Sequence, residues 1–427
     1  MDSSHTVFTP AVPGTGVSAR WWTLLVLTIM YALSLLDRQL LPTLAQSIKV
    51  EFSLSDTQIG LLSGIVFALF YMCVAVPVAV LADRVNRVRL VALSCLLWSV
   101  FTALTGACAT VLQLVMARIG VGIGEAGGSA PSYSIVADYF PPEQRSRAMA
   151  ILNLGLPLGI GAGIALAGTV GAAFGWRAAF FAAALPGVVL SVALVSTVAE
   201  PVRGRLDPAG RAAGRPASFL HSLRTFVRTP LLVRTTIATS LAAVAFVGLA
   251  SWAPTYLMRT RGMSLRDVGL YFSVTSTVGM SLGLALGGFL SDRLSVRNPR
   301  AVAYIPAVAL LIAAPALALA LQFEHWKYTL VFLIPPTMFG IFYLGPATAI
   351  IQNASPPSQR STISALYLFS ANIVGAGGGP LLVGYISDRL VPFYHGKSLM
   401  MALLALLPVY CCAAAAYIWA GKAIPKS

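Results

Sequence analysis

Charged residues are scarce in this sequence. Asp, Glu, Lys and Arg together make up 10% of the 427 residues, whereas hydrophobic residues make up 57%. A typical soluble domain carries about 25% charged residues. The mean hydropathy of +0.81 points the same way. We therefore exclude a soluble globular protein and expect a chain that lies in a lipid bilayer.

The sequence also lacks the side-chain patterns of metal sites and enzymes. The cysteines all fall inside apolar runs, without the spacing of metal ligands or of a disulfide framework; they are Cys73, Cys95, Cys108, Cys411 and Cys412. The histidines fall outside the apolar runs and are His5, His221, His325 and His395. No nucleophile elbow or phosphate-binding loop stands in a usable context. We therefore expect no metal, no other cofactor and no enzymatic activity.

Long apolar runs recur from Trp21 to Ala420. A helix needs roughly 20 apolar residues to cross a bilayer core about 30 Å thick, so these runs predict an all-α membrane protein with twelve transmembrane helices. Their approximate limits are 21–45, 57–82, 90–110, 111–137, 145–173, 178–199, 232–258, 267–291, 301–321, 328–352, 359–386 and 398–421. No apolar run precedes the first of these, so we expect it to be an uncleaved span.

The positive charges behind the net charge of +15 are divided unevenly between the two sides of the membrane that the predicted spans define. With both termini on one side of the membrane, 19 of the 29 Lys and Arg residues fall on that side and 8 on the other, while Arg38 and Arg118 lie within spans. The side richer in Lys and Arg is normally cytoplasmic. We therefore expect a multi-pass protein of the inner (plasma) membrane with both termini in the cytoplasm. The same asymmetry accounts for the basic charge without nucleic acid as a partner.

The chain repeats itself internally. At an offset of 209 residues, Ser55, Gly60, Asp83 and Arg84 align with Ser264, Gly269, Asp292 and Arg293. At an offset of 215, Pro131, Pro141, Pro142, Gln144, Arg145 and Ser146 align with Pro346, Pro356, Pro357, Gln359, Arg360 and Ser361. Such repeats are typical of transporters. They predict two pseudo-symmetric six-helix bundles, residues 1–199 and 231–427, joined by a cytoplasmic linker over 200–230.

Two smaller patterns concern packing. The linker places Phe219, Leu220, Leu223, Phe226 and Val227 on one helical face, which predicts either a short helix on the membrane surface or a plain tether. Glycines also recur every four residues, at Gly120, Gly124 and Gly128 and at Gly155, Gly159 and Gly163. Small residues at this spacing let two membrane helices approach closely.

Four charged residues fall inside the predicted spans. Asp37 and Arg38 lie on the first, and Arg118 and Glu125 on the fourth. A charge at the bilayer centre costs about 2.5–3.5 kcal/mol on insertion scales, so such residues usually face the bundle interior. We expect Asp37 and Glu125 to carry protons, and Arg38 and Arg118 to bind an anion. The alternative is a set of salt bridges that only fixes helix packing.

The C-terminal half carries apolar or small residues at the matching positions, so its side of the cavity is predicted to be apolar and aromatic. Further substrate-binding candidates from both halves are Tyr31, Phe246, Trp252, Tyr256, Thr275, Tyr367 and Asn372. Candidates for a gating latch at the cytoplasmic ends of the helices are Asp83, Arg84, Arg145, Asp292, Arg293 and Arg360. These latch residues also suit plain topology signals. On the outer side, Asp388 and Arg389 are candidates for a latch of the opposite gate.

The sequence resembles the major facilitator superfamily over its whole length. The loop motifs around Asp83 and Asp292 and the fourth-span motif at Arg118 carry this resemblance. More narrowly, the strings 31–39, 54–62, 118–126 and 137–145 look like the Spinster branch, here as a bacterial homologue. That resemblance implies export of lysolipids or sphingosine 1-phosphate by a proton-linked mechanism, with Asp37, Arg38, Arg118 and Glu125 as the functional charges.

We therefore predict a proton-coupled secondary transporter that works by alternating access and moves an amphipathic anionic lipid. Two alternatives stay open from the residues alone. One is a carrier of small organic anions such as sugar acids, and the other is a membrane ligand sensor that transports nothing. Membrane lipids, protons and the amphipathic anion are the expected partners, and we expect a monomer.

Overall fold

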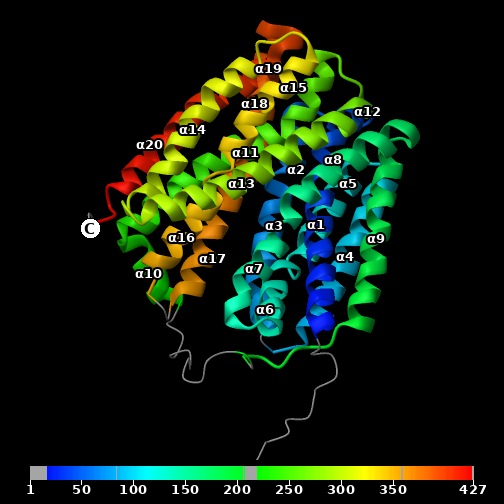
Figure 1. The fold of residues 1–427 in the computed structure, drawn as a ribbon. Helices are drawn as coiled ribbons and strands as arrows, with labels where there is room; N and C mark the ends of the chain where they lie inside the picture. Colours follow the sequence, from blue (N-terminus) through cyan, green and yellow to red (C-terminus); the bar gives the residue numbers. More distant parts are fainter. Residues whose placement is uncertain (1–16, 83, 205, 207–218, 357–358, 426–427) are drawn as a thin grey trace, which may run out of the picture.

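The computed structural model describes residues 17–82, 84–204, 206, 219–356 and 359–425, and these residues form helices joined by turns and loops, without a strand. The helices gather in two lobes (Figure 1). We call α1–α9 the N-half and α10–α20 the C-half. The predicted latch residue Asp83 lies outside the described residues.

The N-half consists of α1 (Val17–Phe52), α2 (Asp56–Ser63), α3 (Ile65–Ala82), α4 (Arg87–Ala107), α5 (Val111–Glu125), α6 (Ser129–Tyr139), α7 (Pro142–Asn153), α8 (Gly155–Phe174) and α9 (Trp176–Thr197). The C-half consists of α10 (Phe219–Arg228), α11 (Pro230–Arg261), α12 (Leu265–Asp267), η1 (Val268–Phe272), α13 (Ser273–Ser295), α14 (Ala301–Ala320), α15 (Trp326–Gly340), α16 (Leu344–Ala354), α17 (Arg360–Ser370), η3 (Ala371–Gly377), α18 (Gly378–Tyr394), η4 (His395–Lys397), α19 (Ser398–Leu404) and α20 (Leu406–Gly421).

The predicted number of spans agrees with these helices. In the described part of the chain, 10 helices are long and apolar enough to cross a membrane. One of them, Thr362–Gly421, runs for 60 residues and includes the 3₁₀ turn at His395–Lys397, so it supplies two predicted spans. The fourth predicted span is divided at Ala126–Gly128 into α5 and α6, which are too short to count separately. Counting Thr362–Gly421 as two spans and α5–α6 as one further span gives twelve spans in the described part of the chain.

The internal repeat appears in the helix boundaries. Helices α5 and α15 begin and end 215 residues apart, and so do α6 and α16. Both spans are therefore broken at the same place, by turns at 126–128 and 341–343. The offset that aligns residue types in the sequence also aligns the helix breaks, so the sequence repeat is a repeat of structure.

Both glycine stripes lie at close helix contacts. A Cβ on Gly159 would lie 2.2 Å from the Ala32 carbonyl oxygen, and one on Gly163 would lie 2.6 Å from that of Leu36. Helix α8 therefore packs directly on the backbone of α1, beside the segment that carries Asp37 and Arg38. A Cβ on Gly124 would lie 2.6 Å from the Trp98 nitrogen, so α5 packs on α4 in the same way.

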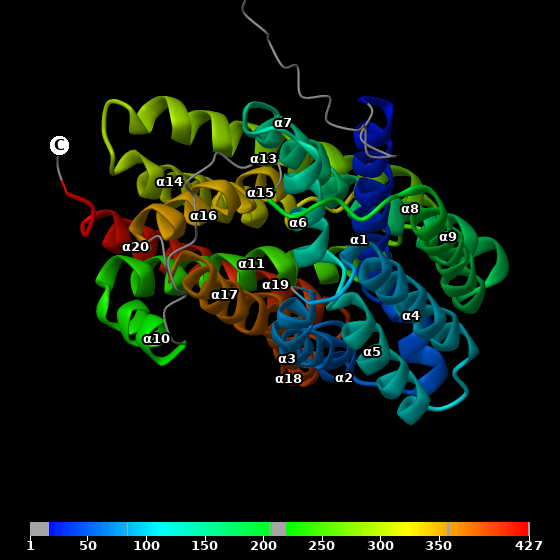
Figure 2. The same ribbon diagram turned by 90° about the horizontal axis from the view of Figure 1, so that it is seen from below.

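Helix α10 forms where the linker pattern predicts one. It lies at the edge of the C-half beside α17, as Figure 2 shows from below. Ser222 is buried, while Phe219, Leu220 and Val227 are 58%, 76% and 63% exposed. The polar Ser222 is thus turned inward and the large apolar side chains outward, the arrangement expected of a helix whose apolar side faces lipid.

The two halves are in contact at one end and diverge at the other (Figure 1). We call the end where α1 begins and α20 ends the terminal end, and the opposite end the sealed end. At the sealed end α2 packs on α18 and α8 packs on η1. A Cβ on Gly168 would lie 2.2 Å from the Gly269 Cα, so the halves meet backbone to backbone. This contact requires glycine on both sides.

We predict that Gly168→Ala opens the sealed end. The added methyl overlaps Gly269, and overpacking costs about 1–3 kcal/mol, which the protein relieves by separating the halves. Each 1.4 kcal/mol by which overpacking destabilises the sealed state should raise the fraction of molecules open at this end about tenfold. The reporter is a cysteine at Ala253, a residue 1% exposed, in a chain whose native cysteines are replaced. Its labelling by a membrane-impermeant thiol reagent should accelerate.

The matched control is Gly288→Ala on α13, because a Cβ there has no heavy atom within 4 Å. This variant should leave the labelling rate at its original value. Equal rates in the two variants would contradict the proposed role of the glycine contact.

Candidate functional site

The four intramembrane charges lie together inside the N-half. Asp37 and Arg38 belong to α1, and Arg118 and Glu125 to α5. Asp37, Arg118 and Glu125 are each no more than 2% exposed, and the Arg38 side chain is 28% exposed. The glycine contacts of α8 with α1 and of α5 with α4 hold both helices close to their neighbours. The charges are therefore fixed within packed backbone.

Arg38 and Glu125 form the ion pair of this group. The Arg38 Nε donates to the Glu125 Oε2 at 2.7 Å. The Arg38 guanidinium also lies 4.6 Å from the Phe67 ring centre and 4.7 Å from that of Tyr71, and the two rings stack at 5.7 Å. Cation–π contacts of this kind stabilise a partly desolvated arginine. Arg38 is thus held by one carboxylate and two rings from α3.

Asp37 points away from this pair. Its Oδ2 accepts a hydrogen bond of 2.7 Å from the Thr102 hydroxyl on α4. The Arg118 guanidinium also lies near Phe67, 5.6 Å from the ring centre. Helix α3 therefore contributes Phe67 to both arginines, a contact that the sequence did not predict.

Several polar atoms of this group have no hydrogen-bond partner among the described residues. They are the Asp37 Oδ1, the Glu125 Oε1 and the Arg118 Nε and Nη1. A buried charged group without partners is costly, and such atoms are usually satisfied by a ligand, a proton or water. The site therefore has unused capacity for binding both protons and an anion.

A small cavity adjoins Glu125 on the N-half side. Its volume is about 20 Å³, and Tyr31, Ser34 and Ser132 line it together with Glu125. A cavity needs roughly 10–15 Å³ to hold one water molecule, so there is room for one here. The Tyr133 hydroxyl, also in the lining, donates to the Asn153 Oδ1 at 2.6 Å. Tyr31, predicted to bind substrate, thus lines a small cavity next to the buried acid Glu125.

The predicted binding residues of the C-half fall into three environments. Phe246 is 7% exposed and lines a cavity of about 10 Å³ between the halves, opposite Gln39. Trp252 donates to the Pro380 carbonyl at 2.8 Å, and Tyr256 to the Leu321 carbonyl at 3.4 Å, so both are used in helix packing. The remaining three are Tyr367, which is buried, and Thr275 and Asn372, which hydrogen-bond to carbonyls of their own helices.

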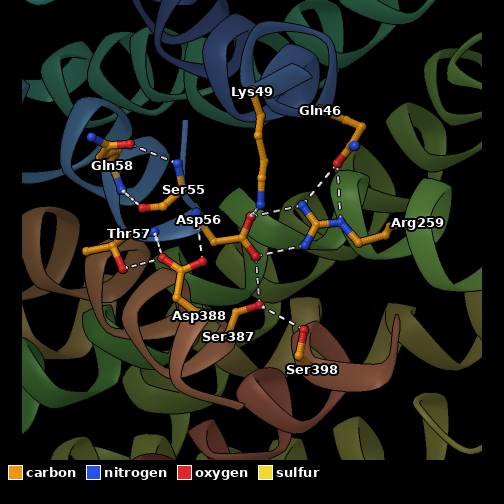
Figure 3. Close-up of polar contacts among 10 residues, drawn as sticks. All are labelled: Gln46, Lys49, Ser55, Asp56, Thr57, Gln58, Arg259, Ser387, Asp388 and Ser398. Carbon is orange, nitrogen blue, oxygen red and sulfur yellow. Dashed lines mark hydrogen bonds and ion pairs between the residues drawn. The ribbon is translucent and has the colours of Figure 1, made fainter. Parts of the chain in front are cut away.

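The sealed end is held by a buried carboxylate, Asp56, at the start of α2 (Figure 3). Arg259 of α11 forms two parallel bonds to it, Nη1 to Oδ2 at 2.8 Å and Nη2 to Oδ1 at 2.9 Å. Lys49 donates to the Oδ1 at 2.5 Å and Ser387 to the Oδ2 at 2.7 Å. Asp56 is fully buried, so this bidentate pair is a strong, desolvated link between the halves.

A second acid from the C-half caps helix α2. The Asp388 carboxylate accepts from the Asp56 nitrogen at 3.0 Å and from the Thr57 nitrogen and hydroxyl at 2.7 and 2.6 Å (Figure 3). Ser55 accepts from the Gln58 nitrogen and completes a capping box. The first backbone N–H groups of α2 therefore donate both to its own cap and to Asp388 of the C-half. Asp388 was a sequence candidate for a latch on this side of the molecule.

The predicted latch residues at the terminal end stay apart in this conformation. Arg84, Asp292, Arg293 and Arg360 are exposed and take part in no ion pair among the described residues. Arg145 donates from its Nε to the carbonyls of Ala137 and Phe140 within the N-half. Among the described latch residues, Arg84, Asp292, Arg293 and Arg360 therefore form no ion pair with one another in this conformation, and the latch stays a prediction.

The sequence reasoning missed Asp56, Lys49 and Arg259, which make the strongest link between the halves. One signal was present, because Ser55 and Gln58 flank Asp56 in the pattern of a capping box. It locates the start of a helix but not the arginine that pairs with it 203 residues away. Phe67 and Tyr71 were also missed, since aromatic residues are common in apolar spans.

Comparisons with known proteins agree with this architecture. Residues 27–380 match the Major Facilitator Superfamily. An MFS-type efflux pump of Mycolicibacterium smegmatis is 34% identical over 96% of this chain and 94% of its own length. Human protein spinster homolog 1 is 31% identical over 88% of this chain and 75% of its own length.

A solved structure extends the match to three dimensions. A bacterial homologue of the human lysosomal transporter Spinster, in an inward-facing and unoccupied conformation, gives a TM-score of 0.86 at 30% identity and covers 95% of this chain and 97% of its own. Family match, relatives and fold point to one conclusion. The chain belongs to the Major Facilitator Superfamily and is a multi-pass membrane transporter of its Spinster-like branch.

Proposed function

We propose that this transporter is proton-coupled and moves an amphipathic anionic lipid, such as a lysophospholipid or a sphingosine 1-phosphate-like molecule. The observation that carries the proposal is the group of unpartnered polar atoms on Asp37, Glu125 and Arg118. Two acids with a free oxygen each can take up protons, and a buried guanidinium with two unpartnered nitrogens can bind a phosphate or carboxylate.

In this proposal, anion binding and proton uptake are linked through the Arg38–Glu125 ion pair. Glu125 is held by Arg38 through one oxygen only, at 2.7 Å. An anionic head that binds Arg38 competes with Glu125 for the guanidinium, and a Glu125 carboxylate that loses this partner is readily protonated in an apolar site. Substrate binding and proton uptake are therefore coupled through Arg38. The apolar wall around Phe246 in the C-half suits the acyl chain.

The direction of access is part of the proposal. We assign the terminal end to the cytoplasm, because 19 of the 29 Lys and Arg residues belong to it. The sealed end then faces outward, and the state described here faces inward, as does the solved Spinster homologue. In the opposite state, Arg84, Arg145, Asp292, Arg293 and Arg360 are proposed to close the terminal end.

The substrate class is tested by proton flux into liposomes that contain the purified protein. One arm receives a lysophospholipid or sphingosine 1-phosphate, and the other a sugar acid. Flux in the lipid arm alone is expected. Flux in the sugar-acid arm alone would move the substrate to small organic anions, and an absence of flux in both arms would contradict proton coupling.

We predict that Glu125→Gln abolishes proton-driven transport and leaves the fold intact. Glutamine keeps the size of the side chain but carries no titratable proton. The measurement is the uptake driven by a pH gradient, together with the thermal melting temperature of the purified variant. The matched control is Glu324→Gln, which neutralises an exposed acid in a loop at the sealed end. Wild-type coupling in Glu125→Gln would overturn the assignment of this residue as a proton carrier.

We also predict that Arg259→Ala populates the state that is open at the sealed end. Removing one partner of a buried ion pair costs about 3–5 kcal/mol, and Asp56 regains solvation only if the halves separate. The measurement is the distance between spin labels at Ala109 and Glu324, exposed positions in the N-half and C-half loops of this end.

A longer-distance population should appear in Arg259→Ala. Arg234→Ala is the matched control, because Arg234 lies on the same helix at the terminal end and stacks 4.5 Å from the Trp419 ring centre. Identical distance distributions in the two variants would contradict a gating role for the Asp56–Arg259 pair.

A further inference from the structure

A large cavity lies in the C-half, away from the central charges. Its volume is about 540 Å³, and it is formed at the terminal end by the last turns of α13 and α16. Among the described residues, its polar lining consists of Ser291, Asp292, Ser295 and Asn353, without Lys or Arg. Typical small-molecule sites have volumes of about 300–1,000 Å³, so this cavity has the size of a ligand site.

The repeat shows what occupies the corresponding place in the N-half. The Arg87 side chain, at the start of α4, is 3% exposed. Its Nη1 donates to Asp138 at 2.5 Å and to Ser134 at 2.7 Å, and its Nε donates to Glu200 at 2.7 Å. A guanidinium thus joins the start of the third span to the end of the fourth and to the segment that follows the sixth.

In the C-half the same positions line the cavity, but the arginine is absent. At the offset of 215, Ser134 corresponds to Ala349 and Asp138 to Asn353, and both counterparts belong to the cavity lining. At the same offset Arg87 corresponds to Val302, which also belongs to the cavity lining, so an apolar side chain stands where the N-half has the guanidinium. The neighbouring Arg300 donates from its Nε to the Ile424 carbonyl at 2.8 Å.

We propose that this cavity is a binding site for a small organic cation, whose ammonium or guanidinium group takes the place that the Arg87 guanidinium has in the N-half.

The donors and acceptors of the lining suit such a ligand. Ser291 is 4% exposed, and its Oγ has no hydrogen-bond partner among the described residues, although the residue lines the cavity. The Asp292 carboxylate supplies the negative charge, and Asn353 carries an amide oxygen at the position of Asp138. Unsatisfied buried polar atoms are costly, so a ligand that donates hydrogen bonds is favoured here.

The walls favour an apolar body behind the cationic group. Leu231, Val302 and Ile350 belong to the lining. A ligand with a ring or short alkyl chain next to its amidinium or ammonium group buries that body against these side chains. The site differs in charge from the central group, where unpartnered arginine nitrogens favour an anion, and it lies in the other half of the molecule.

The test uses benzamidine as the probe and benzamide, its neutral counterpart of the same shape, as the reference. Binding to the full-length purified protein is measured by isothermal titration calorimetry. Benzamidine is expected to bind at least tenfold more tightly than benzamide. Asp292→Asn should lower the benzamidine affinity at least tenfold. Asp267→Asn, which neutralises a half-buried acid at the sealed end, should leave that affinity unchanged.

Two further variants locate the site. Val302→Arg places a tethered guanidinium in the lining of the cavity, so it should abolish benzamidine binding. Glu125→Gln should keep the full affinity, because the central acid is not part of this cavity, and its result separates the site from the proposed proton carrier. Equal affinities for benzamidine and benzamide, an unchanged affinity in Asp292→Asn, or a loss of binding in Glu125→Gln would each overturn the proposal.

Discussion

The burial of Asp56 is the constraint on which this conformation depends. A carboxylate without solvent contact needs cationic and hydrogen-bonding partners, and here they come from α1, α11 and α18, two of which belong to the other half. The two partners from the C-half, Arg259 and Ser387, reach Asp56 only while the halves are in contact at the sealed end. The Gly168–Gly269 contact has the same requirement.

The central site depends in turn on how closely α1 is packed. Glycines of α8 lie against the backbone of α1 next to the segment that carries Asp37 and Arg38, and glycines of α5 lie against α4. This packing directs Asp37 toward Thr102 and leaves Arg38 to pair with Glu125. Phe67 then contacts both arginines. Two adjacent residues of one helix thus have different partners, and each acid keeps one unpartnered oxygen.

Local sequence patterns predicted much of the fold. Apolar runs gave the twelve spans, aligned residue types gave the repeat, and the glycine spacing gave the close helix contacts. The four charges of the site were also predicted, because charge inside an apolar run is conspicuous. Their partners were not. Whether Arg38 or Arg118 pairs with Glu125 depends on the rotation of α1 against α5, and the Asp56–Arg259 pair joins helices 203 residues apart. Neither relation leaves a periodic signal in the sequence.

The comparison of the two halves separates what the fold needs from what transport needs. Both broken spans, α5–α6 and α15–α16, have their break at the same repeat position, so the break belongs to the shared packing of the repeat. The charges do not recur. Glu125 corresponds to Gly340, where a Cβ would lie 3.1 Å from the Phe246 ring, and Phe246 itself corresponds to Asp37. At the two positions where the N-half carries the acids Asp37 and Glu125, the C-half thus has an aromatic ring packed against a glycine. Because the same repeat position is filled without charge in the C-half, packing alone does not account for the desolvation cost of the ionisable residues of the N-half, and this supports their proposed role in transport.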